Sequence, residues 1–184
     1  MAGRVNERTA NWRLFGGGGL ILGGVLWLIV ALAGVGGALG TWLQIIAYIA
    51  LAVAGFMLAF GQTGSNGVVG GSVLGKLGFV AFGLGFALLA VVPLLGFAGV
   101  SLPSVLATVA VVLIALGAIV GAIVAFQKGV ARGVARWIFF VPAVLALVWM
   151  FVTLGWVAIG GNVLVILLTI ALVLAGVAYL LNRR

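Results

Sequence analysis

The sequence lacks most of the side chains on which catalytic and metal sites depend. It has no cysteine and no histidine, and Glu7 is the only acidic residue. These absences exclude protein-ligated zinc, iron–sulfur and histidine-ligated haem sites, nucleophilic catalysis by cysteine or histidine, and acid–base chemistry by paired carboxylates. They also exclude the intramembrane carboxylate or histidine relay of many proton-coupled pumps. We therefore expect no metal and no cofactor.

Apolar residues, by contrast, dominate the chain. Of its 184 residues 66% are hydrophobic and 5% are charged, whereas soluble domains are about 45–50% apolar and about 25% charged. The mean hydropathy of +1.51 is typical of an integral membrane protein. At about 20 apolar residues per crossing, the sequence predicts an all-α, polytopic protein with six transmembrane helices. The expected spans are 14–37, 42–61, 77–99, 103–126, 137–154 and 163–181.

The basic residues occur only in alternate gaps between these spans. Nine cations and one anion give a net charge of +8, and the three short turns hold none of the cations. The positive-inside rule then places both termini in the cytoplasm, beside anionic lipid headgroups. Because the cations occupy short segments and not an extended surface, we expect no nucleic-acid binding. Arg4 and Arg8 precede the expected cytoplasmic anchors, which are Arg13, Lys76, Lys128, Arg132, Arg136, Arg183 and Arg184.

The spans fall into three similar pieces. Each has a basic residue, an apolar span, a glycine-containing turn and a second apolar span, and Thr41 and Asn162 are the expected N-caps of two second spans. Because each piece crosses twice, the sequence predicts three parallel helical-hairpin repeats in one membrane domain, 1–184. The expected hairpins are 14–61, 77–126 and 137–181, joined by cytoplasmic linkers at 62–76 and 127–136.

Two local patterns suggest alternatives. Residues 1–40 combine basic residues, an apolar run and "ALA", as a cleaved signal peptide does, but the run is longer than usual and its removal would leave half a hairpin. "GGSVLGKL", residues 70–77, matches the first seven positions of a phosphate-binding loop. Leu77 replaces the required hydroxyl, and the chain has no aspartate to complete a metal site. We expect a flexible glycine-rich linker there and no nucleotide.

Glycine and polar residues recur at helical spacing within the spans. Gly19-x-x-x-Gly23 and Gly117-x-x-x-Gly121 let helix backbones approach closely, either within one chain or at an oligomer interface. The polar faces of the second spans either pack between helices or line a narrow neutral pathway around a pseudo-threefold centre. These polar candidates are Thr41, Gln44 and Tyr48 with Gly55, Ser104 with Thr108, and Asn162 and Thr169 with Gly176.

Prolines and tryptophans complete the pattern. Pro93 and Pro142 fall inside the third and fifth spans, where each is expected to kink its helix. Most of the six tryptophans lie near expected span ends, as in an interfacial aromatic belt.

Three long segments resemble the HdeD-type acid-resistance membrane proteins. They are "LFGGGGLILGGVLWLIVALAGVGGALGTWLQIIAYIALAVAGFMLAF", "LGFVAFGLGFALLAVVPLLGFAGVSLPSVLATVAVVLIALGAIVGAIVAF" and the stretch from Trp137 to Leu181. Each has a glycine-rich first span, a short turn and a second span ending in small and aromatic residues. The resemblance implies a bacterial inner-membrane protein linked to envelope or acid stress, with no catalytic residues to carry over. The chain departs from that family in its near absence of acidic residues and in its glycine-rich linker at 62–75.

The sequence therefore favours a non-catalytic membrane protein with a structural or interaction role. It would be a small subunit of a larger membrane complex or an envelope-stress protein, with other membrane subunits or copies of itself as partners. The alternative is a passive channel or facilitator for a small neutral solute, which needs no titratable group. An intramembrane enzyme would need serine, tyrosine or lysine to act without histidine, cysteine or a nearby acid.

Overall fold

The computed structural model describes residues 13–61, 67–100, 104–128, 131 and 133–181. In these residues, six helices are long and apolar enough to cross a membrane, as in a multi-pass membrane protein. They lie within a few residues of the expected spans. The helices are η1 (Arg13–Gly17) running into α2 (Gly18–Ala33), α3 (Gly37–Phe60), α4 (Val73–Phe97), α5 (Ser104–Lys128), the short α6 (Val134–Trp137) followed by α7 (Phe140–Thr153), and α8 (Gly161–Leu181).

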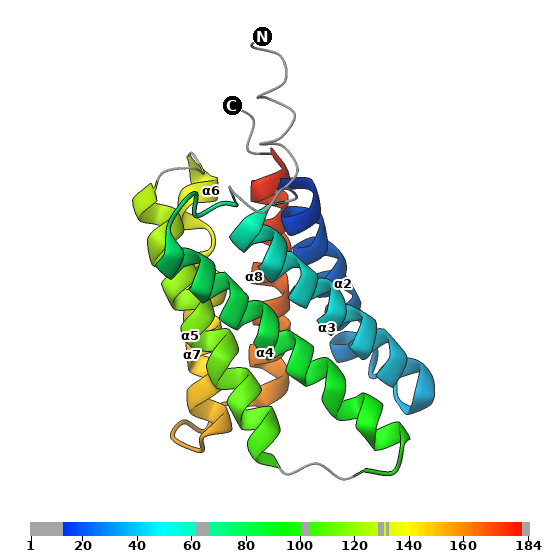
Figure 1. Ribbon diagram of the computed structural model, residues 1–184. Coiled ribbons are helices and arrows are strands. Elements are labelled where there is room, and N and C mark those ends of the chain that lie inside the picture. The colour runs from blue at the N-terminus through cyan, green and yellow to red at the C-terminus, as the bar shows by residue number, and fades with distance from the viewer. Residues whose placement is uncertain (1–12, 62–66, 101–103, 129–130, 132, 182–184) are drawn as a thin grey trace.

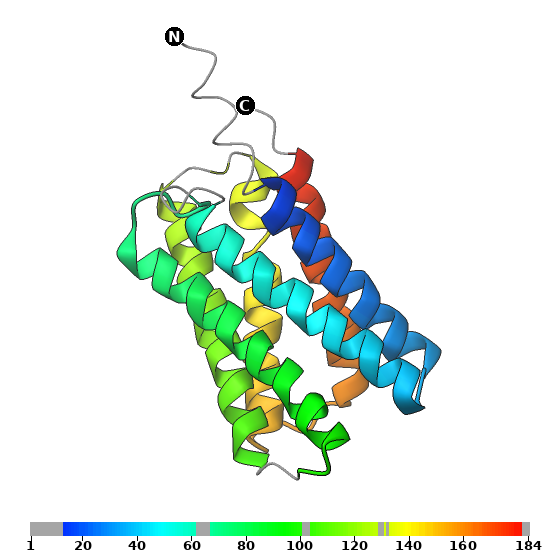
Figure 2. The ribbon, with the colours of Figure 1, turned by 45° about the vertical axis from the view of Figure 1, so that its right-hand side comes forward.

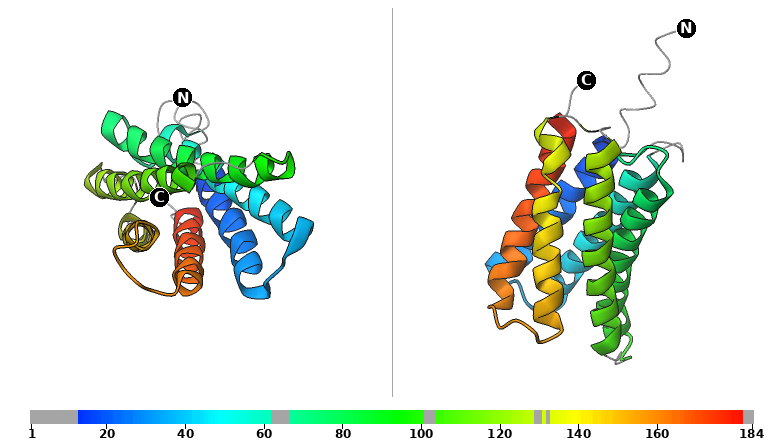
Figure 3. Two further views of the ribbon diagram at one scale, coloured as in Figure 1. Left: turned by 90° about the horizontal axis from the view of Figure 1, so that it is seen from below. Right: turned by 90° about the vertical axis from the view of Figure 1, so that its left-hand side faces the viewer.

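The long helices form a ring in chain order. Consecutive helices run antiparallel and lie side by side (Figures 1 and 2). The closest packing joins α4 to α5, while α3 lies between α2 and α4, and α7 lies beside α5. The last helix, α8, closes the ring, because it packs on α2 more extensively than on its chain neighbour α7, as the end-on view illustrates (Figure 3). The first and last helical turns therefore lie at the same end of the bundle.

Left-handed glycines end the helices at the opposite end. Gly155, with φ of 76°, follows α7, and the N–H of Trp156 donates to the carbonyl of Phe151 at 2.9 Å. This is the Schellman motif, in which glycine takes a backbone conformation that a side chain would strain. Gly99 ends α4 with the same bonding, and Gly34 caps α2 in the same conformation.

Two expected N-caps are wrong. Helix α3 begins at Gly37, so Thr41 already lies inside it and its Oγ1 donates to the Gly37 carbonyl at 3.0 Å. Helix α8 begins at Gly161, which puts Asn162 in the first turn. In both cases the helix extends into the glycine-containing turn.

The start of α4 also lies inside the stretch expected as a linker. The Oγ of Ser72 accepts a hydrogen bond from the N–H of Gly75 at 3.3 Å, which is N-cap geometry. Just before it, Val68 and Val69 are fully buried, and the N–H of Val68 donates to the carbonyl of Leu58 at 2.9 Å. This part of the loop is therefore packed into the end of the bundle.

The two intramembrane prolines have different effects. Pro93 lies inside α4, which continues to Phe97 without a break. Pro142 lies in the first turn of α7, and the helix is interrupted just before it, between Trp137 and Phe140. The proline ring clashes with a carbonyl four residues earlier, so an interruption at that point relieves the conflict.

Candidate functional site

The described cations gather at one end of the ring. Arg13 opens η1, Lys76 lies in the first turn of α4, Lys128 ends α5 and Arg136 lies in α6. This is the end at which the chain enters and leaves the bundle (Figure 1). The opposite end has no charged side chain among the described residues. Three further predicted anchors, Arg132, Arg183 and Arg184, lie outside the described residues.

Two of these cations lie over aromatic rings. The Nε of Arg136 donates to the carbonyl of Phe126 at 2.8 Å, and its guanidinium carbon lies 4.2 Å from the centroid of the Phe126 ring. The ring of Trp137 packs on Phe126 at 4.2 Å and is 59% exposed, as an interfacial anchor would be. The Nζ of Lys76 lies 5.7 Å from the centroid of Phe60, at the end of α3. The contacts of Arg136 and Trp137 with Phe126 therefore hold the short helix α6 against the end of α5.

Aromatic side chains fill the interior of the ring; we call this set the aromatic column. The ring centroid of Trp27 lies 5.3 Å from that of Tyr48 and 5.5 Å from that of Trp149. The rings of Phe82 and Phe86 meet edge to face at 5.0 Å, a favourable aromatic geometry. The members of the column are Trp27, Tyr48, Phe79, Phe82, Phe86, Phe139, Trp149 and Tyr179.

The aromatic column joins helices that are not neighbours in the ring. Phe82, from α4, contacts Phe139, just before α7, at 5.8 Å, and Phe139 stacks on Tyr179 of α8 at 6.2 Å. Trp27 of α2 lies 5.9 Å from Phe86 of α4. Because these rings reach across the centre, they occupy the space through which a pathway along the axis would have to run.

Most of the polar candidates are either exposed at a helix start or bonded within their own helix. Ser104 and Asn162 are exposed at the end opposite the cations. Three hydroxyl groups instead donate to carbonyl oxygens three or four residues earlier in their own helices, a local bond that needs no partner helix. These are Thr41 to Gly37 at 3.0 Å, Thr108 to Ser104 at 3.2 Å, and the buried Thr169 to Ile166 at 2.8 Å.

One polar pair does reach the interior. The Nε2 of Gln44 donates to the hydroxyl of Tyr48 at 2.6 Å, and Tyr48 belongs to the aromatic column. Both residues are on α3, one turn apart. Of the seven polar candidates, the structure thus joins Gln44 and Tyr48 by a bond between side chains, and Thr108 to the backbone of Ser104.

The predicted packing glycines face other helices of the same chain. A Cβ at Gly19 would lie 3.0 Å from the carbonyl oxygen of Ala50, and one at Gly23 would lie closer still to α3, 2.8 Å from the carbonyl oxygen of Ala47. A Cβ at Gly117 or Gly121 would meet α4. These glycines bring α2 onto α3 and α5 onto α4, as small residues do where helix backbones approach in lipid.

Two further glycine pairs lie at interfaces of the ring. A Cβ at Gly55 would lie 2.8 Å from the Cα of Gly83, so α3 and α4 touch backbone to backbone. A Cβ at Gly176 would meet the carbonyl oxygen of Gly17 at 2.6 Å, where α8 closes onto the first helix.

No family model, no curated protein and no solved structure matches this chain. Among the described residues, no group of three histidine, cysteine, aspartate or glutamate side chains is placed to hold a metal ion.

Sequence reasoning missed the aromatic column. Part of it carried a signal, because Phe79, Phe82 and Phe86 recur at spacings of three and four and so share one helix face. The contact between Phe139 and Tyr179 has no signal in the sequence, because it depends on how α7 and α8 are placed in the ring.

Proposed function

We propose that this chain is a non-catalytic protein of the cytoplasmic membrane with a structural or interaction role, acting as a small subunit of a larger membrane assembly. The observation that carries the proposal is the aromatic column, which occupies the interior where a solute or substrate would have to bind. The sequence supports it from another direction, because it supplies no cysteine or histidine and a single acidic side chain. What such a protein offers to partners is its outer apolar surface and its basic end.

The proposed orientation places the basic end in the cytoplasm of a bacterium. Four described cations at one end of an antiparallel bundle, and none at the other, support this arrangement through the positive-inside rule. We also propose that the chain consists of three parallel hairpins. Left-handed glycines at matching places, Gly34, Gly99 and Gly155, support this repeat.

Affinity purification in mild detergent, followed by mass identification of bound proteins, tests the proposed role. A stoichiometric complex with other membrane proteins is the expected result. Turnover of a substrate by the purified chain would overturn the proposal. So would flux of a neutral solute through proteoliposomes that falls on Gln44→Leu or Thr108→Val, because that result would favour the passive facilitator.

The resemblance to HdeD-type proteins adds a physiological proposal, a role in envelope or acid stress. A strain that lacks the chain should survive an acid challenge less well than the same strain carrying it on a plasmid. Equal survival would reject the acid-stress role and leave the subunit proposal standing.

A further inference from the structure

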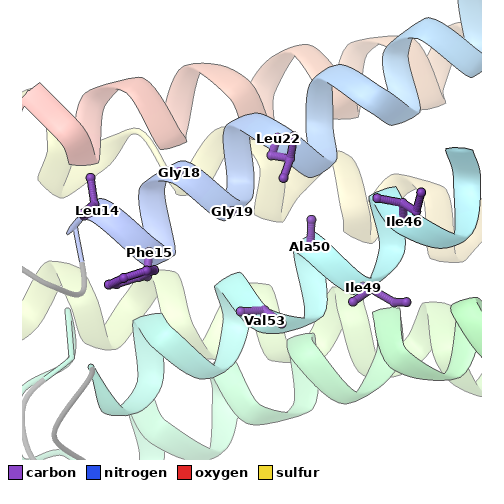
Figure 4. Close-up of a pocket in the computed structure, with 9 residues that line it drawn as sticks. All are labelled: Leu14, Phe15, Gly18, Gly19, Leu22, Ile46, Ile49, Ala50 and Val53. Atoms are coloured by element: carbon purple, nitrogen blue, oxygen red, sulfur yellow. The ribbon is translucent and has the colours of Figure 1, made fainter.

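An open apolar groove runs between the start of α2 and the middle of α3 (Figure 4). It has a volume of about 420 Å³. Small residues form its floor, and larger aliphatic and aromatic side chains, mostly exposed, form its walls. The floor is Gly18, Gly19 and Ala50, and the walls are Leu14, Phe15, Leu22, Ile46, Ile49 and Val53.

The groove exists because two adjacent glycines have different surroundings. A Cβ at Gly19 would lie 3.0 Å from α3, so this glycine sets the close approach of the two helices. A Cβ at Gly18 would meet nothing within 4 Å, so the missing side chain there leaves space on the outer surface. The mouth of the groove is built by the π-helical turn η1, which presents Leu14 and Phe15 outward. Such turns occur often at functional sites.

The mouth of the groove lies toward the end of the bundle that carries the described cations. Arg13 directly precedes Leu14 at the mouth. On the other side, Phe60 follows Val53 by seven residues and so shares its helix face, and the Nζ of Lys76 lies over the Phe60 ring.

The dimensions favour a lipid over a partner helix. The eight steps from Leu14 to Leu22 correspond to about 12 Å of helix, whereas a spanning helix has about 20 residues and is about 30 Å long, so it would extend well beyond the groove. A flexible acyl chain fits a short, narrow groove with branched walls. Its phosphate would then lie at the height of the cations, the arrangement by which basic pockets between helices bind anionic headgroups.

We propose that this groove binds one acyl chain of an anionic glycerophospholipid, with the lipid phosphate held near Arg13 and Lys76. The inference rests on the proposed location in a bilayer, but not on the proposed role as a subunit. Its test needs only the purified chain, so a failure to find partner proteins would leave it unaffected.

Native mass spectrometry of the purified chain, titrated with phosphatidylglycerol or with phosphatidylcholine of the same acyl chains, measures the binding. The wild-type chain should retain one phosphatidylglycerol in preference to phosphatidylcholine. Gly18→Leu should fill the groove and weaken phosphatidylglycerol binding by about tenfold or more. The matched control is Gly96→Leu, because Gly96 is also helical and without a neighbour within 4 Å. It is exposed at the C-terminal end of α4, at the end of the bundle opposite the cations.

Removing a positive charge tests the contribution of the lipid headgroup to binding separately from that of the groove. Arg13→Gln and Lys76→Gln should each reduce the preference for phosphatidylglycerol by about fivefold and leave phosphatidylcholine binding unchanged. Thermal unfolding of every variant checks that the fold is kept. Equal binding of the two lipids by the wild type, or full binding by Gly18→Leu, would overturn the proposal. A dimer that disappears with Gly18→Leu would also overturn it, since the groove would then bind a second copy.

Discussion

At the residue scale, missing side chains decide how closely the helices pack. In lipid there is no hydrophobic force between helices, so van der Waals contact between close backbones stabilises their association. The contact of Gly55 with Gly83 is the clearest case, because no side chain separates α3 from α4 there.

Gly55→Ala should therefore destabilise the protein. The added Cβ would lie 2.8 Å from the Cα of Gly83 and force the two helices apart, at a cost of about 1–3 kcal/mol. Gly96→Ala is the control, because its Cβ meets nothing within 4 Å and alanine favours the helix by about 1 kcal/mol. Thermal unfolding in detergent measures both. If Gly55→Ala were as stable as Gly96→Ala, the helices would not touch there.

The aromatic column makes a second prediction at this scale. Phe86 is fully buried, so Phe86→Ala should lower the free energy of unfolding by about 3–5 kcal/mol through lost contacts and a cavity. Phe97→Ala removes the same atoms from a ring that is 50% exposed and stacks on Trp42, so the loss there should be about 1 kcal/mol. Similar losses for the two variants in chemical denaturation would show that Phe86 is not a core residue.

At the element scale, the sequence predicted the positions of the helices better than the residues at which they begin and end. Long apolar runs are a local signal, so all six spans were placed to within a few residues. The ends depend on competition between local caps. Thr41 was expected to start a helix that in fact begins at Gly37, and Ser72 caps a helix that starts inside an expected linker. The burial of Val68 and Val69 was not predictable, because it depends on the neighbouring helix ends.

Arg136 should control whether α6 stays attached to α5. Arg136→Gln removes both the bond to the Phe126 carbonyl and the stacking on its ring, a loss of about 1–2 kcal/mol. Local opening should then be about five- to thirtyfold more frequent. Trypsin cleavage after Lys128 reports this opening. Lys76→Gln, in the first turn of α4, should leave the cleavage rate unchanged. Equal cleavage rates for wild type and Arg136→Gln would show that Arg136 does not hold α6 on α5.

At the scale of the whole molecule, charge and connectivity are linked. Six antiparallel helices return the chain to the end where it started, so the alternating gaps, and the described cations in them, lie together. The occurrence of basic residues in alternate gaps alone predicted that the cations lie at one end of the bundle. It did not predict that α8 closes onto α2, or that aromatic rings fill the centre, because both depend on contacts between distant parts of the chain.

Single-cysteine labelling tests the membrane arrangement most directly, because the chain has no cysteine of its own. Lys128→Cys places a thiol at the basic end, and Gly160→Cys places one in the turn before α8, where a Cβ has open space. With a membrane-impermeant maleimide, Lys128→Cys should react only in inside-out vesicles and Gly160→Cys only in intact cells. Labelling of both thiols from the same side would contradict the account.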